Sequence, residues 1–107
     1  MKKGIRWYKH LYMAPSVRGL ERTVRYEMKY RRVPYGYYFV TLPECESDIF
    51  DIWGSEQLKM PWIRKRTVDV VGVAGSSREA KELAGAIISE VYKKTGGFDV
   101  RGSLGYK

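Results

Sequence analysis

Five basic residues in the first third of the chain have the types and the spacing to bind a phosphate-bearing or otherwise acidic partner. They are separated by four, three, four and three residues, and they are Arg18, Arg22, Arg25, Lys29 and Arg32. At about 100° per residue, this spacing places all five along one side of an α-helix. Because arginine makes bidentate contacts with phosphates and stacks on bases, the pattern predicts a polyanion-binding surface.

The excess positive charge of the chain lies in the same region. The formal net charge is +8. Residues 1–36 hold ten Lys and Arg against two Glu, an excess of eight, whereas residues 37–107 hold ten basic and ten acidic residues. Charge asymmetry of this kind indicates an anionic partner and says nothing about the fold.

Aromatic residues are interleaved with these charges, as nucleic-acid surfaces often require. They are Trp7, Tyr8, Tyr12, Tyr26, Tyr30, Tyr35, Tyr37 and Tyr38. No helix-turn-helix, zinc-finger, KH or RRM pattern accompanies them. The five basic residues from Arg18 to Arg32, which we call the basic stripe, could therefore bind nucleic acid or an acidic protein, or could simply form a solvated helix face. An anionic membrane surface is a minor alternative.

The turn Gly75, Ser76, Ser77 and Arg78 is a second candidate site, because it joins a predicted strand to a predicted helix. Parallel sheets bind ligands at the carboxyl ends of their strands, and helix N-termini attract anions. The glycine spacing here is GxxG and matches no nucleotide-binding loop. Ser76 and Glu79 also have the spacing of a capping box. We interpret the turn as a capped helix start, with anion or nucleotide-phosphate binding, with or without chemistry, as the alternative.

The remaining reactive groups indicate neither an enzyme nor a metal protein. Cys45 is the single cysteine, so no internal disulfide or Cys-rich zinc site is expected. Glu44 and Glu46 flank it and oppose a thiolate. Together with Asp48 and Asp51 they form an acidic cluster whose spacing does not match a calcium-binding loop. Since no acid–base pair is identifiable, a non-enzymatic binding module without a cofactor is expected.

The positions of these groups depend on a few predicted elements. The valines of residues 67–74 predict a buried strand, and the apolar stripe from Ala80 to Val91 predicts a helix that starts after Ser76 and stops at Gly96. A helix is expected over residues 17–32, because Val17, Leu20, Val24 and Met28 form an apolar line opposite the basic one. Val33-Pro34 ends it.

The other segments carry weaker patterns. Residues 37–42 predict a strand. Residues 4–8 fit a short strand, but Trp7, Tyr8, Leu11 and Tyr12 fit one face of a helical turn equally well. The apolar residues Ile49, Phe50, Ile52 and Trp53 predict a helix that begins at Ser47, breaks at Gly54 and restarts over residues 55–60. A short strand is expected at residues 98–101.

Alternation of strand, helix, strand, helix and strand predicts a single α/β domain over residues 1–107. We expect a three- to four-stranded, mainly parallel sheet with packed helices and right-handed crossovers. Residues 1–14 form an aromatic and basic N-terminal segment, and residues 102–107 are expected to be a flexible tail. The absence of about 18 consecutive apolar residues argues against a transmembrane helix. Because Arg6, Lys9 and His10 interrupt any signal-peptide pattern, a cytoplasmic protein is expected.

The opening segment KGIRWYK resembles the start of a group of small uncharacterised α/β proteins from clostridial-type bacteria. The similarity continues through VDVVGVAG, the helix that follows it and residues 95–101. The resemblance implies a cytoplasmic bacterial protein and carries no function.

Overall fold

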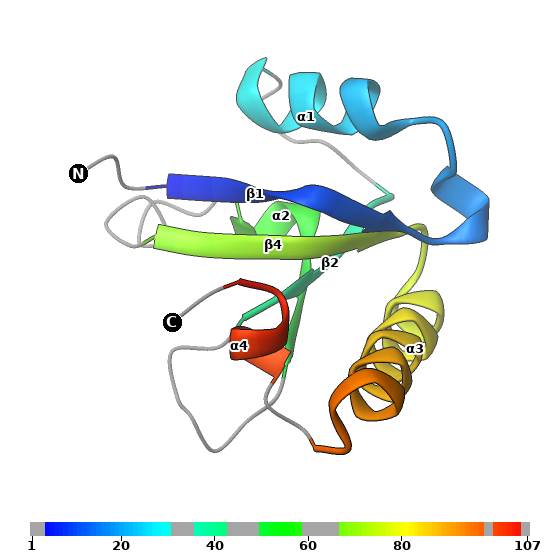
Figure 1. Ribbon diagram of the computed structural model, residues 1–107. Coiled ribbons are helices and arrows are strands. Elements are labelled where there is room, and N and C mark those ends of the chain that lie inside the picture. The colour runs from blue at the N-terminus through cyan, green and yellow to red at the C-terminus, as the bar shows by residue number, and fades with distance from the viewer. Residues whose placement is uncertain (1–3, 31–35, 43–49, 59–66, 98–99, 106–107) are drawn as a thin grey trace.

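The computed structural model describes residues 4–30, 36–42, 50–58, 67–97 and 100–105, which form an α/β structure around one four-stranded sheet. The strand order is β1-β4-β2-β3 (Figure 1). The strands are β1 (Gly4–Met13), β2 (Tyr38–Thr41), β3 (Asp51–Gly54) and β4 (Thr67–Ala74). The valine-rich strand β4 therefore lies inside the sheet, as its nearly continuous apolar sequence predicts.

The sheet is mixed, so the expectation of a mainly parallel sheet is wrong. β1 and β4 are parallel, whereas β2 is antiparallel to both β4 and β3. The error comes from Ile52 and Trp53, which were expected on a helix but pair with Val40 and Phe39 across β2 and β3. A short apolar run fits either element. Residues 42–50 are also fewer than the dozen or more that a parallel crossover needs, so an antiparallel pair forms.

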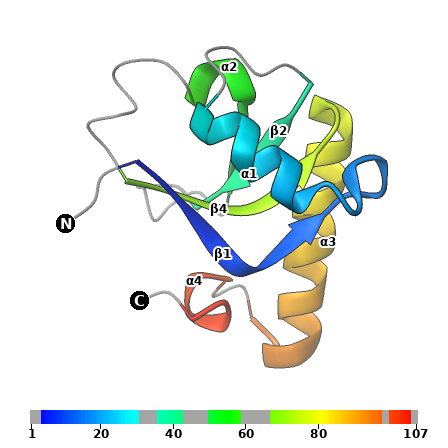
Figure 2. The ribbon, with the colours of Figure 1, turned by 90° about the horizontal axis from the view of Figure 1, so that it is seen from above.

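Helices cover both faces of the sheet (Figures 1 and 2). They are the 3₁₀ turn Pro15–Val17, α1 (Glu21–Tyr30), α2 (Ser55–Leu58), α3 (Ser77–Thr95) and α4 (Val100–Ser103). α1 lies over one face, and α3 and α4 lie over the other. The short strand expected at residues 98–101 is wrong, because α4 begins at Val100. α4 also includes Gly102 and Ser103 of the expected tail, and Leu104 after it is buried.

α3 begins after Ser76 and ends before Gly96, which confirms the predicted bounds of this helix. The Glu79 N–H donates to the Ser76 side-chain oxygen at 3.1 Å, which satisfies a helix N-terminal donor. Gly96 has a left-handed φ of 74°, and its N–H donates to the Tyr92 carbonyl at 2.7 Å. The buried stripe of this helix consists of Ala80, Ala84, Ile87 and Val91.

Gly72 of β4 lets α3 approach the sheet closely. A Cβ atom placed on Gly72 would lie 2.8 Å from Cδ2 of Leu83 in α3 and 3.4 Å from Cβ of Val40 in β2. A side chain at position 72 would therefore occupy the space that Leu83 fills. This glycine serves helix–sheet packing and is not part of a ligand loop.

An ion pair joins the neighbouring strands β1 and β4. Arg6 and Asp69 are direct partners in the parallel register. The Arg6 Nε and Nη2 atoms contact the two Asp69 carboxylate oxygens at 2.6 and 3.0 Å. Asp69 is 8% exposed. Beyond this pair β1 bulges, because the stretch from Trp7 to Tyr12 runs beside only Val70 to Gly72 of β4.

Candidate functional site

The basic stripe is divided between a turn and a helix. A single helix over residues 17–32 was expected, but the described part of α1 begins only at Glu21. Gly19 has a left-handed φ of 85° and separates the 3₁₀ turn from α1. Arg18 therefore precedes the helix instead of extending it. Glycine adopts this conformation readily, which is why the chain changes direction there.

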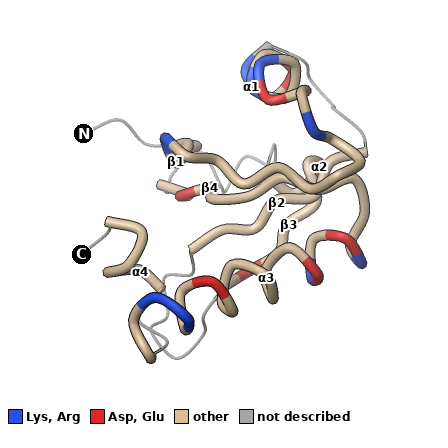
Figure 3. Tube along the Cα trace, turned by 45° about the vertical axis from the view of Figure 1, so that its right-hand side comes forward, with Lys and Arg blue, Asp and Glu red and all other residues tan. Residues whose placement is uncertain are grey.

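The basic residues of the stripe differ in their exposure. Arg18, Arg22 and Lys29 are exposed, and Arg25 is partly buried. Arg32 lies outside the described residues. Figure 3 shows the basic residues of α1 and of the turn before it on the side of the sheet away from α3. The exposed part of the candidate polyanion surface thus consists of Arg18, Arg22 and Lys29.

Arg25 packs α1 against the sheet. Its guanidinium carbon lies 5.6 Å from the centre of the Trp7 ring, a cation–π geometry, and Nη2 is 3.7 Å from Glu21 Oε2. Its Nε is buried and has no hydrogen-bond partner among the described residues. The Trp7 ring in turn meets Phe39 edge to face, with centroids 5.9 Å apart. Arg25 is therefore a docking residue of α1, together with the buried Val24.

The turn at Gly75–Arg78 already holds a carboxylate of the protein itself. The Gly75 N–H donates to Glu79 Oε1 at 2.8 Å, and the Ser16 N–H donates to Oε2 at 3.2 Å. The Ser16 hydroxyl also donates to Oε1. In a capping box the glutamate would reach back to the N-cap residue, but here it joins two turns at the carboxyl ends of the parallel strands β1 and β4.

The surroundings of this turn do not favour an anion. Ser16, Gly75, Ser76, Arg78, Glu79 and Glu82 line an open depression of about 310 Å³. Two of its charged side chains are carboxylates and one is a guanidinium. Since Glu79 uses the converging N–H and O–H donors, an external phosphate would have to displace it. The structure thus supports the capped-turn interpretation of Ser76.

Glu79→Gln is expected to lower the Tm at pH 7, because the carboxylate accepts three hydrogen bonds. These bonds, first from the Ser16 side chain and then from the Gly75 N–H, lower the pKa of Glu79 in the folded protein. The stabilisation is therefore complete above the unfolded pKa of about 4.3 and is lost as the pH falls through the lower folded pKa. Thermal unfolding should show the wild-type advantage constant from pH 7 to about pH 5 and shrinking as the pH falls below about 4.3.

Glu82→Gln is the matched control, because it removes an exposed carboxylate from the same helix and the same depression. Its Tm should stay close to wild type. An equal fall in Tm for both variants would contradict the assignment of Glu79 as the residue that joins the two turns.

Tyr8 and Tyr12 of β1 face α3, so they lie across the sheet from the basic face of α1. Their rings are nearly parallel, with centroids 6.3 Å apart. The pKa of Tyr12 is raised, mainly because its hydroxyl is partly buried and to a smaller extent because the Glu90 carboxylate of α3 and Tyr8 lie near it. The positive charge of Lys94 opposes this rise. Lys94 Nζ pairs with Glu90 Oε1 at 3.0 Å. These aromatics, which the sequence interleaves with the basic stripe, are thus packing residues between β1 and α3.

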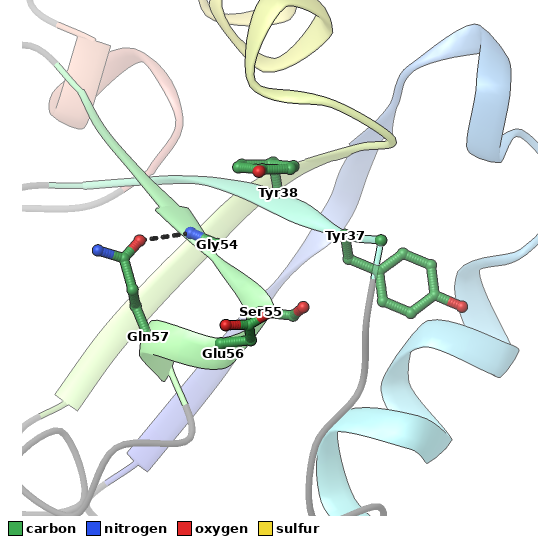
Figure 4. A pocket seen from close by; sticks show the side chains of 7 residues that line it. Tyr37, Tyr38, Gly54, Ser55, Glu56 and Gln57 are labelled. Carbon is green, nitrogen blue, oxygen red and sulfur yellow. Dashed lines mark hydrogen bonds between the residues drawn. The ribbon is translucent and has the colours of Figure 1, made fainter.

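A second depression of about 180 Å³ lies at the start of β2 (Figure 4). It is lined by Gly36, Tyr37, Tyr38, Gly54, Ser55, Glu56 and Gln57. The Gly54 N–H donates to Gln57 Oε1 at 2.8 Å, and the Ser55 N–H donates to the Tyr37 carbonyl at 2.9 Å. The first bond closes the link between β3 and α2, and the second joins the start of α2 to the residue before β2, so neither donor is directed at a ligand.

Several predicted features fall outside the described residues or have no counterpart in them. Cys45 lies in a part of the chain that the structure does not describe, as do Glu44, Glu46 and Asp48. Asp51 is the first residue of β3. Among the described residues, no three His, Cys, Asp or Glu side chains gather as metal ligands would, and no helix is both long and apolar enough to cross a bilayer.

No protein family matches this chain, and neither a curated protein nor a solved structure matches it. The resemblance of the opening segment to clostridial proteins stays a prediction.

Proposed function

We propose that this protein is a small non-enzymatic binding module that holds a polyanion on the exposed basic surface formed by Arg18, Arg22 and Lys29. The observation that carries the proposal is the orientation of α1. Val24 is fully buried and Met28 is 4% exposed, so this side of the helix packs on the sheet. Arg22 and Lys29 lie on the opposite side, and both are exposed.

The geometry of α1 also brings its exposed charges together. Arg22 and Lys29 are seven residues apart, so they project within about 20° of each other and lie about 10 Å apart along the axis. Arg18 continues the surface from the turn before Gly19. The acidic residues Glu21 and Glu27 are only partly exposed. A flexible, negatively charged chain could follow this row of cations.

The α1 surface has better support than the anion-binding alternative at Gly75–Arg78. Glu79 supplies an internal anion to that turn, and Glu82 adds a second negative charge beside it. Around the exposed cations of α1, by contrast, the acidic residues Glu21 and Glu27 are less exposed than Arg22 and Lys29.

A triple variant of the surface, Arg18→Gln, Arg22→Gln and Lys29→Gln, tests the proposal. Binding of fluorescein-labelled oligonucleotides and of polyglutamate is measured by anisotropy at several salt concentrations. If all three side chains contact phosphates, the slope of log K against log salt should become shallower by about 2–3, because each contact contributes about 0.7–0.9.

The matched control removes the same charge from α3. Arg78→Gln, Lys81→Gln and Lys93→Gln neutralise three exposed cations on the other side of the sheet. This variant should keep the wild-type affinity to within a few-fold. If the two triple variants lose affinity equally, binding follows net charge and the α1 surface is not the site. Absence of wild-type binding to every polyanion would overturn the proposed function.

A further inference from the structure

We infer that the polyanion is a single-stranded nucleic acid and that Tyr26 provides the surface on which an unpaired base stacks. This inference rests on the proposed function, since it names the partner of the same surface. It begins with the exposure of one aromatic residue. Tyr26 is 63% exposed, more than the other two large apolar side chains that are exposed among the described residues, Tyr92 at 49% and Leu20 at 39%.

The exposure of Tyr26 follows from its place on the helix. At about 100° per residue, Tyr26 lies about 160° from Val24 and from Met28. Those two side chains are buried against the sheet, so Tyr26 must project away from it.

The exposed cations Arg22 and Lys29 are surface neighbours of Tyr26 on α1. Arg22 precedes it by four residues and Lys29 follows it by three, which are the spacings of surface neighbours on a helix. In angular terms Arg22 lies about 40° to one side and Lys29 about 60° to the same side, whereas Glu21 and Glu27 lie about 140° and 100° away. The ring therefore adjoins the positively charged sector of the helix.

An exposed ring beside two cations suits a base and its phosphates together. Single-strand-binding proteins combine a basic track for the backbone with aromatic rings for the bases, and stacking tolerates any base sequence. A duplex offers fewer free base faces to a ring on a helix surface, because its bases stack on one another. Carboxylates of an acidic protein offer no such face at all. The combination of Arg22, Tyr26 and Lys29 thus favours a single strand.

Tyr26→Ala and Tyr26→Phe test this inference. Anisotropy is measured with single-stranded RNA and DNA of about 12 nucleotides, with a duplex, and with an abasic oligomer of the same length and charge. Tyr26→Ala should weaken binding of the single strands by about 5- to 150-fold, the equivalent of one stacking interaction. It should leave the abasic oligomer within about two-fold, and Tyr26→Phe should retain wild-type affinity for all ligands. A difference between the RNA and DNA arms identifies which single strand is preferred, and equal affinity supports their shared chemistry.

Tyr92→Ala is the matched control, because it removes an exposed tyrosine from α3. It should leave every affinity unchanged. The inference is overturned if Tyr26→Ala has no effect on single strands, if it weakens the abasic oligomer equally, or if the wild type prefers polyglutamate or duplex. In those cases the triple Gln variant still decides the proposed function independently, because its effect depends on charge and not on the ring.

Discussion

Replacing Arg6 with methionine is expected to lower the free energy of unfolding by about 2–3 kcal/mol, because the Asp69 carboxylate then stays in the sheet without its bidentate partner. Removing one member of a buried ion pair costs about 3–5 kcal/mol. The cost is reduced here because the Arg6 side chain is 54% exposed, whereas that of Asp69 is only 11% exposed. Methionine retains most of the aliphatic length, so the variant isolates the charge. Urea denaturation followed by circular dichroism measures the loss.

The double variant Arg6→Met, Asp69→Leu is the control for this prediction. It removes both charges and should recover at least half of the lost stability, because an apolar pair leaves no unpartnered charge in the sheet. A loss below about 0.5 kcal/mol for Arg6→Met alone would show that the pair behaves as a solvent-screened surface pair. Failure of the double variant to recover stability would show that the cost arises from packing.

The second large effect is expected at Gly72, where valine should destabilise the protein by about 1–3 kcal/mol, because the Leu83 side chain must move to admit it. The new Cβ would lie 2.8 Å from Leu83 Cδ2 and 3.4 Å from Val40 Cβ, and the two Cγ atoms would need further room. Overpacking of a core in this way costs about 1–3 kcal/mol and sometimes more. β4 lies between β1 and β2 and under α3, so the strand has little freedom to move away.

Two further variants identify the cause of that loss. Leu83→Ala combined with Gly72→Val should be less destabilising than the sum of the single variants by about 1–2 kcal/mol, because the truncated side chain leaves room for the valine. At Gly85 of α3 a Cβ would meet nothing within 4 Å. Gly85→Val should therefore change stability by less than about 0.5 kcal/mol. Strict additivity at positions 72 and 83 would exclude steric conflict as the reason for Gly72.

The proposed binding surface on α1 shows why the spacing of the basic residues was by itself an incomplete guide to the candidate site. The helical spacing predicted that the five basic residues are equivalent. In the structure, Arg25 lies over the ring of Trp7, which is far from it in the sequence, and Arg18 precedes Gly19, which has a left-handed φ. Both outcomes depend on where α1 crosses the sheet, which the helical spacing of the residues does not specify. Tyr26 was visible as one of many interleaved aromatics. Its exposure distinguishes it from Tyr12, which packs toward α3.

The sequence by itself determined the elements whose signals are local. The β4–α3 unit was predictable because valines, the Ser76 cap, one apolar stripe and the Gly96 stop all lie within a single stretch and agree with one another. The basic excess of the first third was also visible directly, since charge needs no fold to be counted.

Only the tertiary structure decided how distant segments pair. Ile52 and Trp53 fit a helix or a strand until β2 offered them a partner, and that pairing made the sheet mixed. From the sequence, the Glu79 carboxylate was expected to reach back to the start of its own helix. Because β1 and β4 are parallel, the Ser16 turn lies beside that helix start, and the carboxylate accepts hydrogen bonds from both Ser16 and Gly75. Such choices depend on contacts between residues far apart in the chain, where the local pattern is equally compatible with either outcome.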